Sequence, residues 1–134
     1  LHFETGLLRL LESSEFSGKV VTASDGVKVL KVQGEIDPHA WQSLGNIRQY
    51  AKNISNGLQT LKPQSKERFI QRLNGFIAEV DRLEQRAHQQ FQTVPAERRK
   101  IVTSHDAFAY LAAEFELTFL APVGLSTDEE PSGA

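Results

Sequence analysis

Two histidines in this chain have neighbours that are typical of a metal site. His39 lies in the segment 37–41 (Asp-Pro-His-Ala-Trp), and His105 lies in the segment 103–108 (Thr-Ser-His-Asp-Ala-Phe). Each segment places a helix-capping residue shortly before the histidine, so the sequence predicts each imidazole at the second position of a helix. The positive end of a helix dipole favours the neutral imidazole, which is the form that binds metal. Because the same dipole repels a cation, a complete site also needs at least one carboxylate.

The elements that position these histidines follow from the spacing of apolar residues. The predicted elements are a helix at 5–11, short strands at 19–22 and 27–32, and two long helices at 40–62 and 63–94. Both long helices carry apolar residues every three or four positions, and each ends before a proline. The predicted core residues include Trp41, Phe76, Phe108 and Phe115.

A strand, helix and strand follow the second long helix. The segment 100–103 is typical of a buried strand, it leads directly into the predicted helix of His105, and 117–120 is the next strand. This pattern predicts a βαβ unit, in which ligands bind beyond the carboxyl ends of the strands. His105 lies immediately past such an end, whereas His39 follows its strand less directly.

The composition excludes several classes of function. The chain of 134 residues has a formal net charge of −2 and no cysteine. It therefore has no thiolate ligands or disulfides, and no charge excess that would favour nucleic acid; the basic run at 98–100 is typical of a solvated edge. No apolar run approaches the length of a membrane span. Ser104, His105 and Asp106 contain the residue types of a hydrolase triad, but adjacent residues cannot form that relay, so we do not expect an enzyme.

Several segments together resemble one protein family. Segment 37–41, the break at Pro63, segment 94–108 and segment 120–132 resemble, in order, the solute-binding proteins of zinc and manganese ABC importers. The resemblance implies an α/β fold: the central part of a two-lobed metal-binding protein with a long connecting helix and incomplete flanking sheets. The implied parts are the latter part of the N-terminal lobe at 1–62, the connecting helix at 63–94 and the first part of the C-terminal lobe at 95–134.

The resemblance also implies a ligand set. In this family four side chains hold the metal in the cleft; His39 matches the ligand late in the first lobe, and His105 matches the first ligand of the second lobe. The family's remaining histidine and aspartate correspond to positions before Leu1 and after Ala134, so we expect the chain to be an excised piece. Histidine at 105 favours Zn²⁺. Mn²⁺ is the alternative, because segment 27–36 lacks the histidine-rich loop of many zinc importers.

The implied function is extracytoplasmic capture of Zn²⁺ or Mn²⁺, in the periplasm or on a membrane anchor, and delivery to an ABC permease. An isolated histidine near a helix start more often caps the helix or fills space, but two within one family pattern favour metal ligation. The alternative of another class is a structural or adhesive interaction module with a vestigial metal site. We expect the 134-residue chain alone to bind metal weakly and to self-associate through exposed apolar edges.

Overall fold

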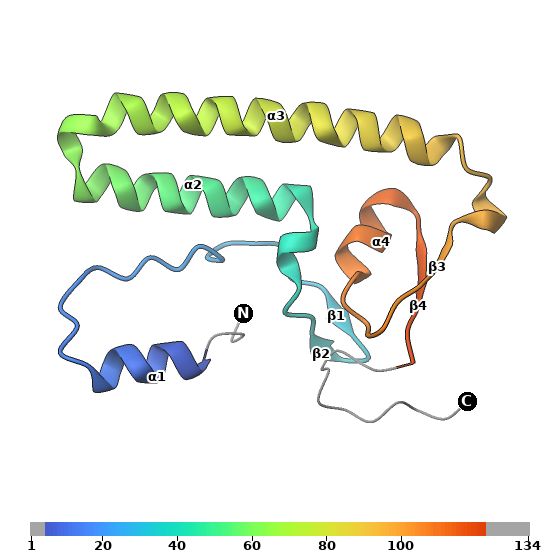
Figure 1. Ribbon diagram of the computed structural model, residues 1–134, viewed down its shortest axis with the longest axis horizontal. Helices are drawn as coiled ribbons and strands as arrows, with labels where there is room; N and C mark the ends of the chain where they lie inside the picture. The colour runs from blue at the N-terminus through green and yellow to red at the C-terminus, as the bar shows by residue number, and fades with distance from the viewer. Residues whose placement is uncertain (1–4, 123–134) are drawn as a thin grey trace.

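Two long antiparallel helices dominate the computed structural model, which describes residues 5–122. Helix α2 (Leu44–Leu61) and helix α3 (Lys66–Gln92) lie side by side and are joined through the 3-10 turn η2 (Pro63–Ser65) (Figure 1). The side chain of Ser43 caps α2 by accepting a hydrogen bond from the backbone N–H of Asn46 at 3.4 Å. The two predicted long helices are confirmed, although α2 begins later than expected because the 3-10 turn η1 (Ala40–Gln42) precedes it.

Besides the long helices, the structure contains two small sheets and a short helix. Strands β1 (Lys31–Val32) and β2 (Glu35–Ile36) form an antiparallel hairpin. Its turn has positive φ at both central residues, Gln33 and Gly34, which matches the twist of a two-residue hairpin. Strands β3 (Lys100–Val102) and β4 (Thr118–Leu120) are parallel and are connected through α4 (Ala109–Phe115). The predicted βαβ unit is therefore confirmed.

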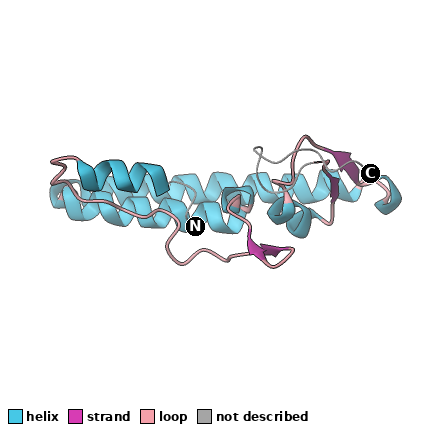
Figure 2. Cartoon of the chain, turned by 90° about the horizontal axis from the view of Figure 1, so that it is seen from below, coloured by secondary structure: helices cyan, strands magenta, loops and turns pink. Residues whose placement is uncertain are grey.

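The remaining elements are helix α1 (Thr5–Ser13) and the 3-10 turn η3 (Ala96–Arg98). The predicted strand at 19–22 is wrong. This segment forms no strand and instead lies against α2, where a Cβ added at Gly57 would come within 2.5 Å of Val21. Val21 therefore lies against a helix, and its segment has no partner strand among the described residues. Seen from below, the molecule is elongated along α2 and α3 (Figure 2).

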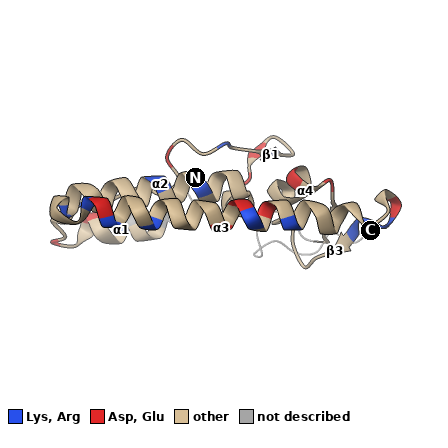
Figure 3. Ribbon diagram, turned by 90° about the horizontal axis from the view of Figure 1, so that it is seen from above, with Lys and Arg blue, Asp and Glu red and all other residues tan. Residues whose placement is uncertain are grey.

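One arginine forms salt bridges between the two long helices. The guanidinium of Arg48 on α2 donates hydrogen bonds to Asp81 at 2.6 and 2.8 Å and also binds Glu84, both on α3. The hydrogen bond to Glu84 is the main cause that raises the pKa of Arg48 above its ordinary value. Figure 3 shows acidic and basic residues interspersed along the helices.

The core gathers around α4 and the start of α2. The buried apolar residues of the described part include Ala40, Val80, Ala107, Tyr110, Phe115 and Leu117. Phe115 is confirmed as a core residue, and Phe108 is half-buried, stacked on Phe119 with ring centroids 4.9 Å apart. Trp41 and Phe76 are not core residues, since they are 39% and 43% exposed.

These errors have local causes. Trp41 belongs to the turn η1, so the helical spacing that predicted its inward position does not apply. Phe76 lies on α3 where the α2–α3 pair is open on one side. Strand β3 was expected to be buried but is exposed, because within residues 5–122 its sheet has only two strands. The sequence also predicts His2 as an ordinary residue and a helix start at 130–134, and both lie outside the described residues.

Among residues 5–122, no helix combines the length and apolar composition needed to cross a membrane.

Candidate metal site

The structure brings His39 and His105 together from distant parts of the sequence. Their ring centroids are 5.6 Å apart, with an angle of 57° between the ring planes. His39 follows the β1–β2 hairpin and His105 follows β3, so each lies just past the end of a strand. The ring of Trp41 lies edge-on beside the ring of His39, with the ring centroids 5.3 Å apart.

The expected position of both imidazoles in the first turn of a helix is wrong. His39 immediately precedes the three-residue turn η1, and His105 lies in a bend four positions before Ala109, where α4 begins. Both capping residues serve local turns instead. Asp37 accepts a hydrogen bond from the backbone N–H of His39, and the Thr103 hydroxyl donates to the backbone carbonyl of His105. Neither ring therefore lies where the expected helix dipole would act on it.

A buried carboxylate holds the ring of His39. Asp37 is fully buried and His39 is 5% exposed; Oδ1 of Asp37 lies 2.7 Å from Nδ1 of His39 and 2.9 Å from its backbone nitrogen. An ionised carboxylate only accepts hydrogen bonds, so Nδ1 carries the proton and Nε2 is the nitrogen that would bind a metal. A carboxylate behind a histidine in this way is the usual arrangement around metal-binding imidazoles.

His105 is held through its backbone more than through its ring. Its carbonyl accepts hydrogen bonds from the hydroxyl of Thr103 at 3.0 Å and from the backbone N–H of Ala107 at 3.1 Å. The ring itself has a weak contact, 3.4 Å from Nδ1 to the hydroxyl of Ser104, and the residue is half-buried. The two histidines are therefore unequal: the ring of His39 is fixed by a buried charge, and that of His105 is held more loosely.

Tyr110 on α4 reaches the segment that carries His39. Its hydroxyl accepts a hydrogen bond from the backbone N–H of Leu30 and donates one to the carbonyl of Asp37, both at 3.0 Å. The residue is 3% exposed. Sequence reasoning missed Tyr110, and its only signal was a hydroxyl-bearing side chain in a mainly apolar helix.

Asn46 and Glu114 complete the contacts around the site, and neither was predicted. The buried amide of Asn46 donates to the carbonyls of Lys28 and Ala40. Glu114 on α4 accepts a hydrogen bond from the backbone N–H of Leu44 at 3.1 Å, so it caps the start of α2. The Glu114 contact joins α4 to the start of α2, and the Asn46 contacts hold the segments on either side of His39.

The buried hydroxyl of Tyr110 predicts a loss of stability in alkali. Burial raises the pKa of Tyr110 above the ordinary value of 10.0, so its stabilising contribution is complete below that pH and is lost as pH rises towards the folded-state pKa. We expect the free energy of unfolding to decrease more steeply above pH 10.0 in the wild type than in Tyr110→Phe. Urea unfolding across this range measures both slopes, and equal slopes would contradict the assignment.

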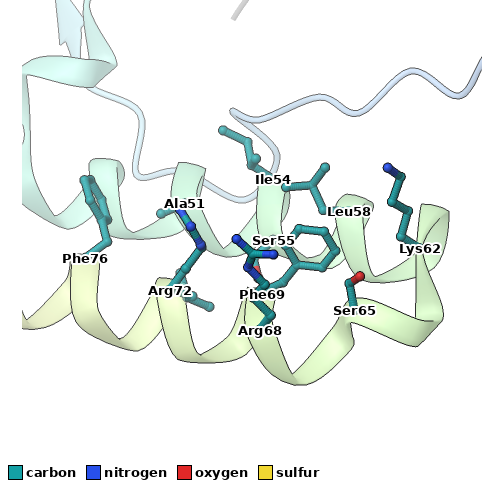
Figure 4. Close-up of a pocket in the computed structure, with 11 residues that line it drawn as sticks. Ala51, Ile54, Ser55, Leu58, Lys62, Ser65, Arg68, Phe69, Arg72 and Phe76 are labelled. Carbon is teal, nitrogen blue, oxygen red and sulfur yellow. The ribbon is translucent and has the colours of Figure 1, made fainter.

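Two observations limit the extent of the candidate site. Within residues 5–122, no group of three or more His, Cys, Asp or Glu side chains could hold a metal ion, so further ligands would have to come from elsewhere. An apolar groove of about 620 Å³ lies between α2 and α3 and is lined by neither histidine (Figure 4). Its lining includes Leu58, Phe69 and Phe76, with Arg68 and Arg72 beside them.

The fold is shared with solved metal-binding proteins. The periplasmic zinc-binding protein TroA from Treponema pallidum matches 98% of this chain and 49% of its own, with a TM-score of 0.88 and 30% identity. The laminin-binding protein Lmb of Streptococcus agalactiae, described as bifunctional with adhesin and metal-transporting activity, matches 82% of this chain and 42% of its own, with a TM-score of 0.75 and 32% identity. The fold is therefore that of the metal-binding solute-binding proteins of ABC importers.

Sequence comparison defines the family. PsaA of Streptococcus pneumoniae, a manganese ABC transporter substrate-binding lipoprotein, is 38% identical over 98 residues, which are 69% of this chain and 32% of PsaA. All 134 residues match the model of the ZnuA family, zinc-uptake complex component A, periplasmic, and the chain belongs to this family. The predicted resemblance and fold class are confirmed. The chain spans less than half the length of each of these relatives.

Proposed function

We propose that the full-length protein captures Zn²⁺ outside the cytoplasm, in the periplasm or on a membrane anchor, and delivers it to an ABC permease. The observation that carries this proposal is the pairing of His39 with His105 at a centroid distance of 5.6 Å. Two imidazoles that share one Zn²⁺ through their nitrogens at about 2.1 Å have centroids roughly 5–6 Å apart. The observed spacing therefore suits one shared ion.

The division into parts supports the same proposal. We propose that residues 1–62 belong to an N-terminal lobe and 95–134 to a C-terminal lobe, with 63–94 as the connecting helix. His39 and His105 then come one from each lobe. An ion bound by both would hold the two lobes together. The permease would then recognise this metal-bound form, and no reaction would be catalysed.

The donor types favour Zn²⁺ over Mn²⁺. Neutral imidazole is a common Zn²⁺ ligand, whereas Mn²⁺ prefers more oxygen ligands and binds a given site less tightly. Relatives of this chain are named for either metal: TroA for zinc and PsaA for manganese. Mn²⁺ therefore remains the alternative cargo.

Metal titration of the full-length protein tests the proposal. Zn²⁺ and Mn²⁺ are added in competition with a chelator, and we expect one Zn²⁺ per chain with higher affinity than Mn²⁺. Tighter Mn²⁺ binding would reassign the cargo, and absence of binding by both ions would refute capture.

The likeness to Lmb favours a second candidate, adhesion. In that case the metal site would be vestigial and the surface would bind an extracellular protein. Adhesion is supported if the wild type binds no metal but adheres to immobilised laminin, and if the double replacement His39→Ala and His105→Ala leaves that adhesion unchanged. Capture is favoured if the wild type binds metal and does not adhere, and the double replacement abolishes metal binding.

A further inference from the structure

A chain of buried hydrogen bonds runs from the helix that follows His105 to the ring of His39. The hydroxyl of Tyr110 on α4 donates to the carbonyl of Asp37, and the carboxylate of Asp37 accepts from Nδ1 of His39. All three residues are at most 5% exposed. The contact therefore joins the part of the chain after α3 to the part before it, directly behind one imidazole of the pair.

We propose that Asp37 and Tyr110 are positioning residues, which set the tautomer of His39 and its distance from His105 before the metal arrives. This inference rests on the proposed function, since it names the residues that prepare the same site. Asp37 controls the ring, because its oxygen fixes the proton on Nδ1 and directs Nε2 away from itself. Tyr110 controls the backbone that carries Asp37.

The role of Tyr110 follows from its two hydrogen-bond partners. Leu30 and Asp37 face each other at the open end of the β1–β2 hairpin, where the backbone N–H of Asp37 donates to the carbonyl of Leu30 at 3.0 Å. The Tyr110 hydroxyl bridges the same two residues through the N–H of Leu30 and the carbonyl of Asp37. Without the hydroxyl, both backbone groups lose their partner in a buried position, and the hairpin end must shift to recover one. His39 moves with that segment.

Asp37 contributes negative charge to the site in addition to orienting the ring of His39. The paired imidazoles are neutral donors, so they offset none of the charge of a divalent ion. The second carboxylate oxygen of Asp37 has no hydrogen-bond partner among the described residues. A fully buried carboxylate without complete hydrogen bonding is costly in the empty protein, and a cation bound to the imidazole in front of it offsets that cost.

The test removes one hydroxyl in the full-length protein. Tyr110→Phe keeps the buried ring and deletes both hydrogen bonds. The control Thr60→Val also removes one hydroxyl, an exposed one on α2 that donates to the carbonyl of Asn56. We expect the Zn²⁺ affinity, measured with Zn²⁺ alone against a chelator, to fall about 10-fold in Tyr110→Phe. Nitrogen-15 spectra of the metal-free protein should show His39 changing from one tautomer to a mixture. Thr60→Val should match the wild type in both measurements.

A second pair of variants separates shape from charge and covers the case in which Tyr110→Phe does not fold. Asp37→Asn retains an acceptor oxygen for Nδ1, whereas Asp37→Ala removes it. We expect the Nδ1–H tautomer of His39 to persist in Asp37→Asn and to be lost in Asp37→Ala, with Zn²⁺ affinity about 10-fold and about 100-fold below the wild type.

The outcomes separate this inference from the proposed function. If the wild type binds Zn²⁺ and the Tyr110→Phe protein binds it equally with an unchanged His39 tautomer, Tyr110 has no positioning role although capture stands. If the wild type binds neither Zn²⁺ nor Mn²⁺, capture fails, and the tautomer spectra of the metal-free variants still decide whether Asp37 and Tyr110 position the ring.

Discussion

Replacing either His39 or His105 by alanine in the full-length protein is expected to weaken Zn²⁺ binding by at least about 100-fold, more than the loss of an outer hydrogen-bond partner would. Each replacement removes one of two imidazoles whose centroids are 5.6 Å apart, and within residues 5–122 no other histidine or acidic cluster is placed to substitute. Competition titration with a chelator measures the change. His88→Ala is the control, because this exposed histidine packs on Phe115, away from the pair.

The two variants should differ in the stability of the metal-free protein. His39→Ala leaves the fully buried carboxylate of Asp37 without its ring partner, which we expect to cost about 3 kcal/mol of unfolding free energy. His105→Ala removes a half-buried ring with one weak contact and should cost under about 1 kcal/mol. Equal losses in both, with Zn²⁺ affinity unchanged, would show that the histidines are structural and that the pair is not a metal site.

The elements that the sequence predicted well have strong periodic signals. The two long helices carry apolar residues at regular helical spacing and are interrupted at Pro63, so α2 and α3 were predicted nearly to their ends. The strand–helix–strand order after α3 has short connections, and this predicts a parallel pair. By contrast, the segment at 19–22 has only its β-branched composition, and the strand preference of such residues depends on packing against neighbouring strands, which this segment lacks among the described residues.

Of the candidate site, the sequence predicted only the two histidines. Segment 37–41 and segment 103–108 carry recognisable residue types, but the turns that hold His39 and His105 depend on local backbone geometry that helix-capping rules do not describe. Tyr110 and Glu114 contact residues more than 60 positions away, and no local pattern encodes such a contact. The periodicity of α3 likewise did not predict which of its apolar residues are buried, because that depends on residues distant in the sequence.

A pair of phenylalanine variants tests where the stabilising core lies. Phe115→Ala is expected to lower the unfolding free energy by about 3–5 kcal/mol, because Phe115 is 4% exposed and packs on Phe91 with ring centroids 5.2 Å apart. Phe76→Ala should cost less than about 1.5 kcal/mol, since its side chain is 43% exposed beside the α2–α3 groove and already contacts solvent. The sequence alone predicted both phenylalanines as core residues, so a clear difference between the two losses would follow from the structure and not from the sequence pattern.

Urea unfolding of the full-length variants, with Zn²⁺ titration in parallel, decides between them. Since Phe115 stands at the end of α4 and Tyr110 lies in the same helix, loosening α4 should also weaken Zn²⁺ binding, but only modestly and through position. Phe76 lies on α3 and has no such route to the histidines, so Phe76→Ala should leave Zn²⁺ affinity unchanged. A larger stability loss in Phe76→Ala than in Phe115→Ala would mean that the α2–α3 groove is covered in the full-length protein and that the stabilising core extends there from α4.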